Sequence, residues 1–288
     1  MSVRADLMLG GGEETPRLHK VEFVHGLNAN RQLFVENIKA NIRDHAVASL
    51  RTRRSMLVAG GPSAAEYIED IKRLKSQGWD LFTVNGAHDW LIEQGIFPNA
   101  CVAMESQDVV DTFIRNPQHD CTYYLASQVN PKLFTRLVRG GFKVVMFHAE
   151  LDDETTSLIE TLDKEPTIMA GVPTVGLHTL GVIYTLGAKK VNVYGLDSSH
   201  RGAVDHAYDN SQQAPIIPLE FIFKGQRFIS TGTWASQADR FAKMWPMYFR
   251  LGMRIEVFGD GLLPAMYAHE KEKLMNELQQ RIPSDGEV

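Results

Sequence analysis

Short apolar runs that alternate with helix-forming stretches are the feature that most constrains this fold. The runs with strand character lie at residues 56–59, 81–84, 100–104, 122–126, 143–147, 190–194 and 254–258. Apolar residues recur at helical spacing between them, at 64–77, 131–139, 171–187 and 234–251. Such alternation is typical of βαβ units, and strands that are apolar throughout are buried on both faces. The pattern predicts an α/β fold, a mostly parallel sheet with helices on both faces.

Two further helices are expected outside this alternation. An amphipathic pattern runs over 28–50, and cations at its end, among them Arg54, would complement the helix dipole. A charged helix is expected at about 265–281. We divide the chain into an N-terminal arm and helix (1–50), a main domain (51–260) and a C-terminal helix (261–288).

One segment of the main domain fits the alternation poorly. Residues 197–233 are rich in Asp, Ser, Gln, Pro and Gly, with a hairpin pattern at 221–229. A long irregular insertion in an α/β domain is often a functional lid. We predict a lid here.

Composition excludes several classes of protein. The 288 residues are 44% hydrophobic, enough for a sizeable core, and the net charge of −5 argues against a nucleic-acid partner. No apolar run reaches the ~20 residues of a bilayer span, and 1–20 has no apolar signal segment. Cys101 and Cys121 lie in apolar stretches and are expected to be reduced. We expect a cytoplasmic protein without a membrane span, and the terminal helices offer surfaces for a homodimer.

The turn after the first strand is the first candidate site. Gly60 and Gly61 permit a tight turn, Pro62 suits a first helical turn, and the N–H groups up to Ser63 could bind an anion. The other interpretation is an ordinary βα turn. If the site is real, Gly61→Val should abolish nucleotide binding, while the fold survives or loses only modest stability.

Other strand ends carry polar residues at the same predicted edge of the sheet. Asn85 and Gly86 follow the second strand and could contact a base or sugar, or form a plain turn. Glu105 follows the third strand and could hold Mg²⁺ or a ribose hydroxyl. Nearby Asp108 could do the same, or stabilise a helix start.

Two later turns complete the set. Gly171 and Thr174 open a helix suited to phosphate, in which Gly176 and Gly181 would permit close packing on the sheet. Gly195 and Asp197 end a strand, and Asp197 could bind a metal or a hydroxyl.

The loop after Asp197 adds further polar residues. It contains His200, Arg201, Asp205 and His206, whose spacing matches no zinc signature.

The order of these turns resembles a known family. Gly60–Ser63, Val84–Ala87 and Gly95–Pro98 resemble the first half of the MptE-like 6-hydroxymethylpterin diphosphokinase domain. The turns at 171–174, 186–188 and 194–197, followed by His206, resemble its second half. The same elements are similar to bacterial sialyltransferases that use a CMP-sugar and to flagellin-modifying motility accessory factors. The resemblance implies a Rossmann-like domain that binds a nucleotide by its phosphates and transfers a phosphate-linked group.

Two departures from these families bear on the reaction. Diphosphokinase-like members often have Asp where this chain has Glu105. The sialyltransferase-like enzymes carry a histidine base where this chain reads Ile-Ser-Thr-Gly-Thr-Trp at 229–234, and no histidine lies between His206 and His269. A general base contributes ~10²–10⁴-fold, whereas phosphoryl transfer depends more on metal ions and positioning. This comparison favours the diphosphokinase.

The expected function is therefore a transferase that moves a diphosphate from ATP to a hydroxyl of a small acceptor. Mg²⁺ would be held by Asp197 and Glu105, while Arg201 and His206 would close over the developing charge. The residues expected to bind the nucleotide are Gly60, Gly61, Pro62, Ser63, Asn85, Gly86, Gly171, Thr174 and Gly195. A CMP-sugar glycosyltransferase and a non-catalytic nucleotide-binding module are the alternatives.

Overall fold

The strand-forming runs assemble into one parallel sheet. The computed structural model describes residues 31–41, 52–150, 152–163, 166–169, 174–209 and 218–280. Within these residues the main sheet has eight strands in the order β10-β7-β1-β2-β3-β4-β5-β6, all paired in parallel. The strands are β1 (Arg54–Val58), β2 (Asp80–Val84), β3 (Ala100–Ala103), β4 (Thr122–Ala126), β5 (Lys143–Ala149), β6 (Ile168–Met169), β7 (Lys190–Tyr194) and β10 (Arg254–Val257). The predicted α/β, Rossmann-like fold is confirmed.

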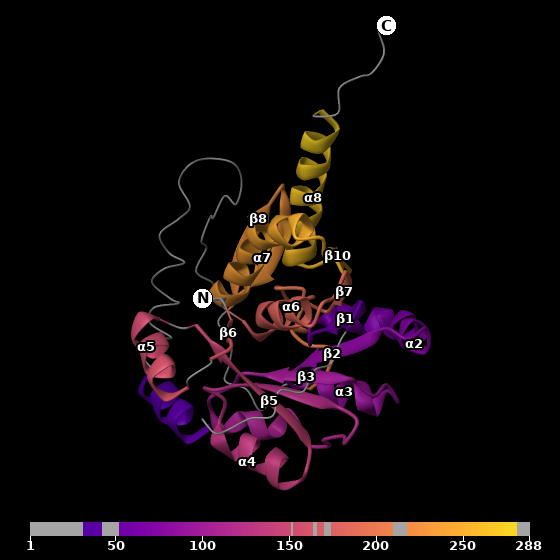
Figure 1. Ribbon diagram of the computed structural model, residues 1–288. Coiled ribbons are helices and arrows are strands. Elements are labelled where there is room, and N and C mark those ends of the chain that lie inside the picture. Colours follow the sequence, from indigo (N-terminus) through magenta and orange to yellow (C-terminus); the bar gives the residue numbers. More distant parts are fainter. Residues whose placement is uncertain are drawn as a thin grey trace, which may run out of the picture.

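Helices cover both faces of the sheet, which explains why its strands are apolar throughout (Figure 1). One face carries α2 (Ile68–Ser76), α3 (Ala87–Glu93), the 3₁₀ helix η2 (Asp108–Thr112) and α4 (Pro131–Arg139). The other carries α6 (Val175–Thr185), α7 (Gly232–Arg250) and α8 (Leu262–Gln280). In β1, Met56 contributes to the core on the α2 side and Leu57 to the core on the α6 side.

The strand order predicts where a ligand would bind. The chain runs from β1 outward through β2 to β6, then returns to place β7 on the other side of β1. Connections therefore leave β1 and β7 in opposite directions, and ligands of open α/β sheets bind in the crevice at such a switch point. The 3₁₀ helix η1 (Pro62–Tyr67) follows β1 at this point.

A helix at residues 31–41 buttresses the same edge of the sheet. The side-chain amides of Asn37 and Asn41, one turn apart, donate to carbonyls of Ser106 and of 127–129, in the loops after β3 and β4. Ile38 between them is fully buried. The predicted N-terminal helix is thus present at 31–41. The arm at 1–30, residues 42–51 and the end at 281–288 lie outside the described residues.

Three details differ from the sequence prediction or extend it. Arg54 is the first residue of β1 and does not end a helix. The helix α5 (Asp153–Leu162) and the two-residue strand β6 were not predicted. The predicted hairpin is confirmed as β8 (Leu219–Phe223) paired with β9 (Gln226–Ser230).

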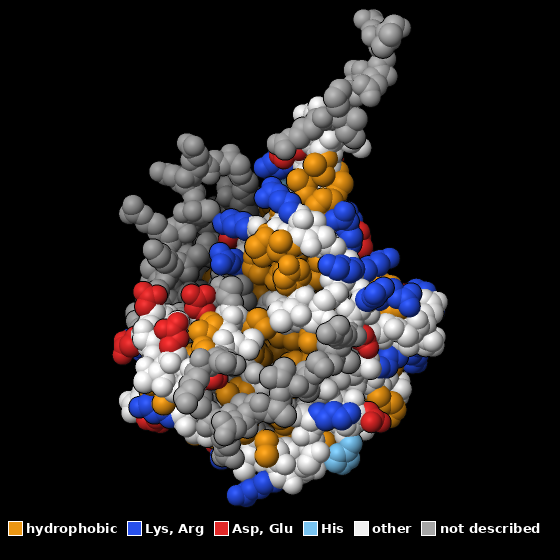
Figure 2. All heavy atoms as spheres, viewed as in Figure 1, with side chains coloured by type: hydrophobic (Ala, Val, Ile, Leu, Met, Phe, Trp, Pro, Cys, Tyr) orange, Lys and Arg blue, Asp and Glu red, His pale blue; other side chains and the backbone are white. Residues whose placement is uncertain are grey.

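The α7–α8 layer forms one side of the molecule, and α8 projects from the body (Figure 1). Figure 2 shows hydrophobic side chains reaching the surface over this layer, with Lys and Arg around them. None of the described helices combines the length and hydrophobicity that a bilayer span requires. Cys101 and Cys121 are buried free thiols, as expected.

Candidate functional site

A cleft of about 470 Å³ opens at the carboxyl ends of β1, β2, β3 and β7. The amino ends of α6 and α7 form its opposite wall. It brings together eight of the predicted site residues, Gly60, Gly61, Asn85, Glu105, Thr174, Gly195, Asp197 and His206. Pro62, Ser63, Gly86 and Arg201 do not line it. Gly171 lies outside the described residues.

Asp197 is bonded through both carboxylate oxygens to Ser63. Oδ2 accepts the Ser63 N–H at 2.8 Å, and Oδ1 accepts the Ser63 hydroxyl at 2.6 Å. Burial raises the pKa of Asp197, and the two bonds from Ser63 partly oppose this. The pair ties the start of η1 to the loop after β7. The Ser63 N–H, expected to bind phosphate, is therefore already bonded within the protein.

Position 61 requires glycine because Gly195 and Asp197 leave no room for a side chain there. Its N–H donates to the Gly195 carbonyl at 2.7 Å. A Cβ at Gly61 would lie 2.5 Å from that oxygen and would also overlap the Asp197 carboxylate. Gly61→Val would therefore disrupt the β1–β7 junction, which argues against the expectation of only a modest loss of stability.

Tyr208 is a cleft residue that the sequence interpretation missed. A Cβ on Gly60 would lie 2.6 Å from Tyr208 Oη, and one on Gly86 would lie 2.8 Å from Tyr208 Cε2. The Ala207 N–H donates to the Gly60 carbonyl at 2.9 Å and fixes the segment. Glycines at the ends of β1 and β2 thus accommodate one tyrosine ring. The available signal was an aromatic residue two positions after His206.

His206 lies in an aromatic and acidic environment at the cleft. Its ring centroid is 5.3 Å from that of Tyr208 and 6.0 Å from that of Trp234, the third residue of α7. Nδ1 lies 3.3 Å from an Asp205 carboxylate oxygen. Burial lowers the pKa of His206, and Asp205 opposes the shift only in part. Burial therefore favours the neutral form of the ring.

Arg201 turns away from the cleft. It forms ion pairs with Glu66 and Asp260, and its hydrogen bond to Asp260 is the main reason that its pKa is raised. Arg201 was expected to close over the developing charge together with His206, but only His206 lines the cleft.

The amino end of α6 opens into the cleft without a carboxylate. Thr174 is the N-cap, but its side chain accepts no hydrogen bond from the helix, and the first turn has no acidic residue. The Thr174 hydroxyl donates to Oε1 of Gln237 on α7, whose Nε2 donates to Ser198 Oγ at 2.8 Å. A Cβ on Gly176 would lie 2.6 Å from Leu196, which confirms the predicted close packing. At Gly181 a Cβ would meet nothing nearer than 3.6 Å, so close packing there is not required.

The carboxylates predicted to hold Mg²⁺ do not form a ready-made site. Asp197 is committed to Ser63, and Glu105 Oε1 accepts the Gln107 N–H at 3.0 Å. Among the described residues, no three His, Cys, Asp or Glu side chains are grouped to hold a metal. Asp108 pairs with Lys132 and Asn130, so its structural interpretation holds. No Lys or Arg is found among the described residues that line the cleft.

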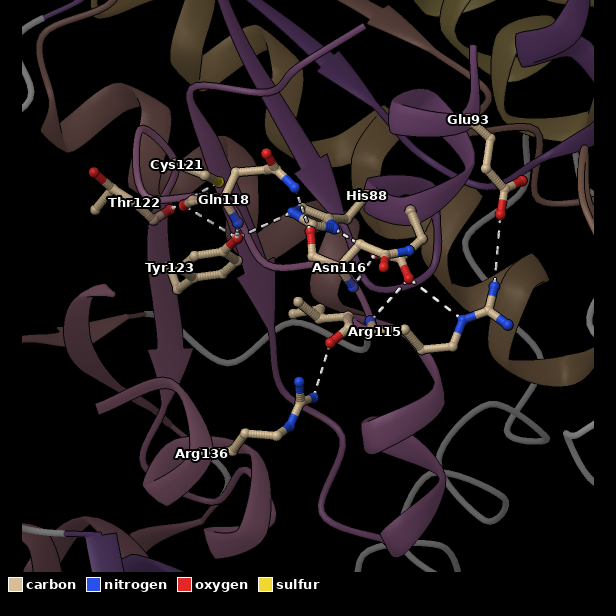
Figure 3. Close-up of polar contacts among 11 residues, drawn as sticks. His88, Glu93, Arg115, Asn116, Gln118, Cys121, Thr122, Tyr123 and Arg136 are labelled. Atoms are coloured by element: carbon tan, nitrogen blue, oxygen red, sulfur yellow. Dashed lines mark hydrogen bonds and ion pairs between the residues drawn. The ribbon is translucent and has the colours of Figure 1, made fainter. Parts of the chain in front are cut away.

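A buried polar network surrounds His88 on α3, the helix that begins two residues after Asn85 (Figure 3). His88 on α3 bonds Asp89 through Nδ1 at 2.7 Å and the Tyr123 hydroxyl through Nε2 at 3.2 Å. Asp89 also accepts the Arg115 N–H at 2.8 Å. Asn85 itself has φ 45°, a left-handed conformation that Asn tolerates. Its buried Oδ1 accepts no hydrogen bond from the described residues.

Comparisons with known proteins extend these findings. The sequence model described as 6-hydroxymethylpterin diphosphokinase MptE-like matches residues 32–202, which leaves His206, Tyr208 and α7 outside the matched region. A search of curated proteins gives no match. The fold is similar to that of the MAf glycosyltransferase from Magnetospirillum magneticum AMB-1, with a TM-score of 0.52 and 17% identity. That match covers 91% of this chain but 46% of the other. A mammalian sialyltransferase matches at a TM-score of 0.42 and 12% identity, over 85% of this chain and 87% of the other.

Proposed function

Since the chain belongs to the MptE-like family, described as 6-hydroxymethylpterin diphosphokinases, we propose that this transferase moves a diphosphate from ATP to a hydroxyl of a small acceptor. The observation that carries the proposal is the amino end of α6, which opens into the cleft with no acidic residue in its first turn. Unpaired N–H groups at a helix start carry about half a positive charge and bind phosphate. The helix lies where the switch point of the sheet predicts a nucleotide.

The charge of the lining supports a nucleotide that arrives with its own cation. Glu105 and Asp205 line a cleft whose described residues include no Lys or Arg. A bare triphosphate would be repelled by the carboxylates, and helix ends alone compensate it weakly. Magnesium is typically held by one or two carboxylates together with phosphate oxygens and water. We therefore propose Mg·ATP as the substrate and Glu105 as the protein carboxylate that meets its metal.

His206 fits the handling of the acceptor proton. A neutral imidazole can accept a proton from a hydroxyl that attacks the phosphate. Burial lowers the pKa of His206 and so favours this neutral form. Asp205 beside Nδ1 can stabilise the imidazolium that results.

One observation favours a second candidate, transfer of a sugar from a nucleotide. The sialyltransferase-like pattern places a histidine in the segment 229–234, where this chain has none. The rings of His200 and His206 lie 5.2 and 6.0 Å from Trp234 in that segment. An imidazole is therefore supplied at this place by a different part of the chain.

Nucleotide binding with and without Mg²⁺ tests the proposal. Thermal unfolding of the full chain would be followed with ATP, GTP and CMP, each with Mg²⁺ or with EDTA. A ligand at a hundredfold excess over its Kd stabilises by about 2.7 kcal/mol. We expect such stabilisation only for ATP with Mg²⁺. We expect the Glu105→Gln variant to lose this stabilisation. Glu93→Gln, at an exposed carboxylate of α3 outside the cleft, is the control.

The other outcomes separate the candidates. Stabilisation by CMP with no effect of Mg²⁺ would replace diphosphate transfer with glycosyl transfer. Normal Mg²⁺ dependence in Glu105→Gln would remove Glu105 from the metal site. Turnover is then measured as AMP release with a panel of hydroxyl-bearing acceptors.

A further inference from the structure

A row of cations crosses the edge of the sheet opposite to the cleft. Arg54 of β1 and Arg254 of β10 are both register partners of Lys190 in β7. All three side chains are exposed. Neighbouring strands are ~4.8 Å apart, so the backbones of these three residues lie within about 10 Å along the edge. Like charges at paired positions destabilise a sheet, and the fold tolerates this cost at three adjacent strands.

Three more cations extend this row into a surface. Arg53 and Lys189 precede β1 and β7, and the Lys189 N–H donates to the Arg53 carbonyl at 2.9 Å. Arg250 ends α7, four residues before Arg254. We call these six residues the cationic face, namely Arg53, Arg54, Lys189, Lys190, Arg250 and Arg254. Among the described residues, no carboxylate forms an ion pair with any of them.

The charged groups of three of these residues lie over aromatic rings. Arg54 and Lys190 lie over Trp79 at 5.8 and 5.4 Å from its centroid, and Arg254 lies over Phe249 at 3.9 Å. The charges are thus held at fixed places and still face solvent.

Two large apolar side chains are exposed beside the cationic face. Met247 and Leu251, at the end of α7, are each 47% exposed. Leu251 is three residues before Arg254, whose N–H donates to the Lys189 carbonyl at 2.9 Å, so apolar and cationic residues are continuous. Figure 2 shows Lys and Arg around hydrophobic side chains where Figure 1 places α7 and β10.

We propose that the cationic face docks on an anionic lipid bilayer, with Met247 and Leu251 entering the interfacial region. Clustered Lys and Arg are attracted to anionic headgroups, and neighbouring apolar residues add affinity by leaving water. The chain as a whole carries −5, so the attraction is local to this face. A nucleic-acid partner would be bound through phosphates alone and would gain nothing from the exposed Met247 and Leu251.

The proposal fixes the orientation of the bound protein. The cationic face lies at the amino ends of β1, β7 and β10, whereas the cleft lies at the carboxyl ends of β1 and β7. A five-residue strand separates the two edges by about 16 Å. The docked protein would therefore keep its cleft open to solution.

Co-sedimentation of the full chain with lipid vesicles tests the proposal. We expect binding to vesicles of equal parts phosphatidylcholine and phosphatidylglycerol, and none to phosphatidylcholine alone. Lys189→Gln with Lys190→Gln should weaken partitioning about fivefold for each charge removed. Lys72→Gln with Lys132→Gln, two exposed lysines elsewhere, is the matched control. Leu251→Ser should weaken binding further without changing its dependence on salt.

Two results would overturn the proposal. One is that the protein sediments equally with both vesicle types, or that it sediments with neither type. The other is binding of duplex DNA that matches the binding of anionic vesicles, with neither affected by Leu251→Ser. That second result would assign the face to a polyanion and not to a bilayer. Circular dichroism of each variant checks that the fold is retained. We expect that it is, because all substituted side chains are exposed.

Discussion

Gly86→Ala tests whether Gly86, at the end of β2 beside the cleft, is glycine to admit a ligand or to make room for the Tyr208 ring. Gly86 has φ −65° and ψ −15°, which alanine adopts without strain, so the substitution reports only on the added methyl group. That methyl group would lie 2.8 Å from Tyr208 Cε2 and 2.9 Å from Oη. Ordinary carbon contacts are at ~3.5–4 Å, and overlaps of this kind typically cost ~1–3 kcal/mol.

A double-mutant cycle with Tyr208→Ala isolates this contact. Once the ring is gone, Gly86→Ala should cost little, which gives a coupling free energy of about 1–2 kcal/mol in urea unfolding. Gly181→Ala is the control, because its methyl group would meet nothing nearer than 3.6 Å. That control should stabilise α6 by roughly 0.5–1 kcal/mol, as Ala does relative to Gly inside a helix.

Nucleotide titration of the same four proteins decides between the two roles. If the glycine instead admits the ligand, Gly86→Ala would leave the unfolding free energy unchanged. It would then weaken nucleotide binding equally with and without Tyr208. That pattern would refute the assignment of Gly60 and Gly86 to Tyr208.

Two further predictions concern Asp197 and His206. Asp197→Ala should lower the free energy of unfolding by about 2–5 kcal/mol, since it leaves two buried donors of Ser63 unpaired. Asp197→Asn should cost less, because an amide can keep both bonds; a stable Asp197→Asn without Mg²⁺-dependent turnover would instead make Asp197 a metal ligand. The pKa of His206 is lowered below 6.5, so its charged form is disfavoured in the fold, and both stability and turnover should fall as the pH drops below 6.5. His206→Gln should remove this acid limb from the pH–rate profile, and an unchanged limb would exclude the ring from proton transfer.

Periodicity predicted most of the sheet because most strands are short, mainly apolar runs between helix-forming stretches. It failed for α5 and β6. The helix is rich in Thr and Glu, and β6 pairs through two residues only. The usable signal for α5 was Asp152 followed by Thr155, whose side chains form a capping box.

The location of the site was predictable, but the roles of its residues were not. Strand ends of a parallel sheet meet at one edge, so Gly60, Asn85, Glu105 and Asp197 were expected together. Whether a backbone N–H is free for a ligand depends on partners distant in sequence. Ser63 and Asp197 are 134 residues apart, and no local pattern links them. The sequence likewise does not show which side chain packs against a given glycine.

The charged residues differ between the two ends of the strands. The six cations of the cationic face lie at the amino ends of the strands, and the described lining of the cleft at the carboxyl ends has carboxylates and no Lys or Arg. Charges ~16 Å away are screened beyond a Debye length of about 8 Å at physiological salt. The cationic face therefore cannot compensate a triphosphate bound in the cleft. Positive potential there must come from the ends of α6 and α7 and from a cation that arrives with the nucleotide, which is why binding should depend on Mg²⁺.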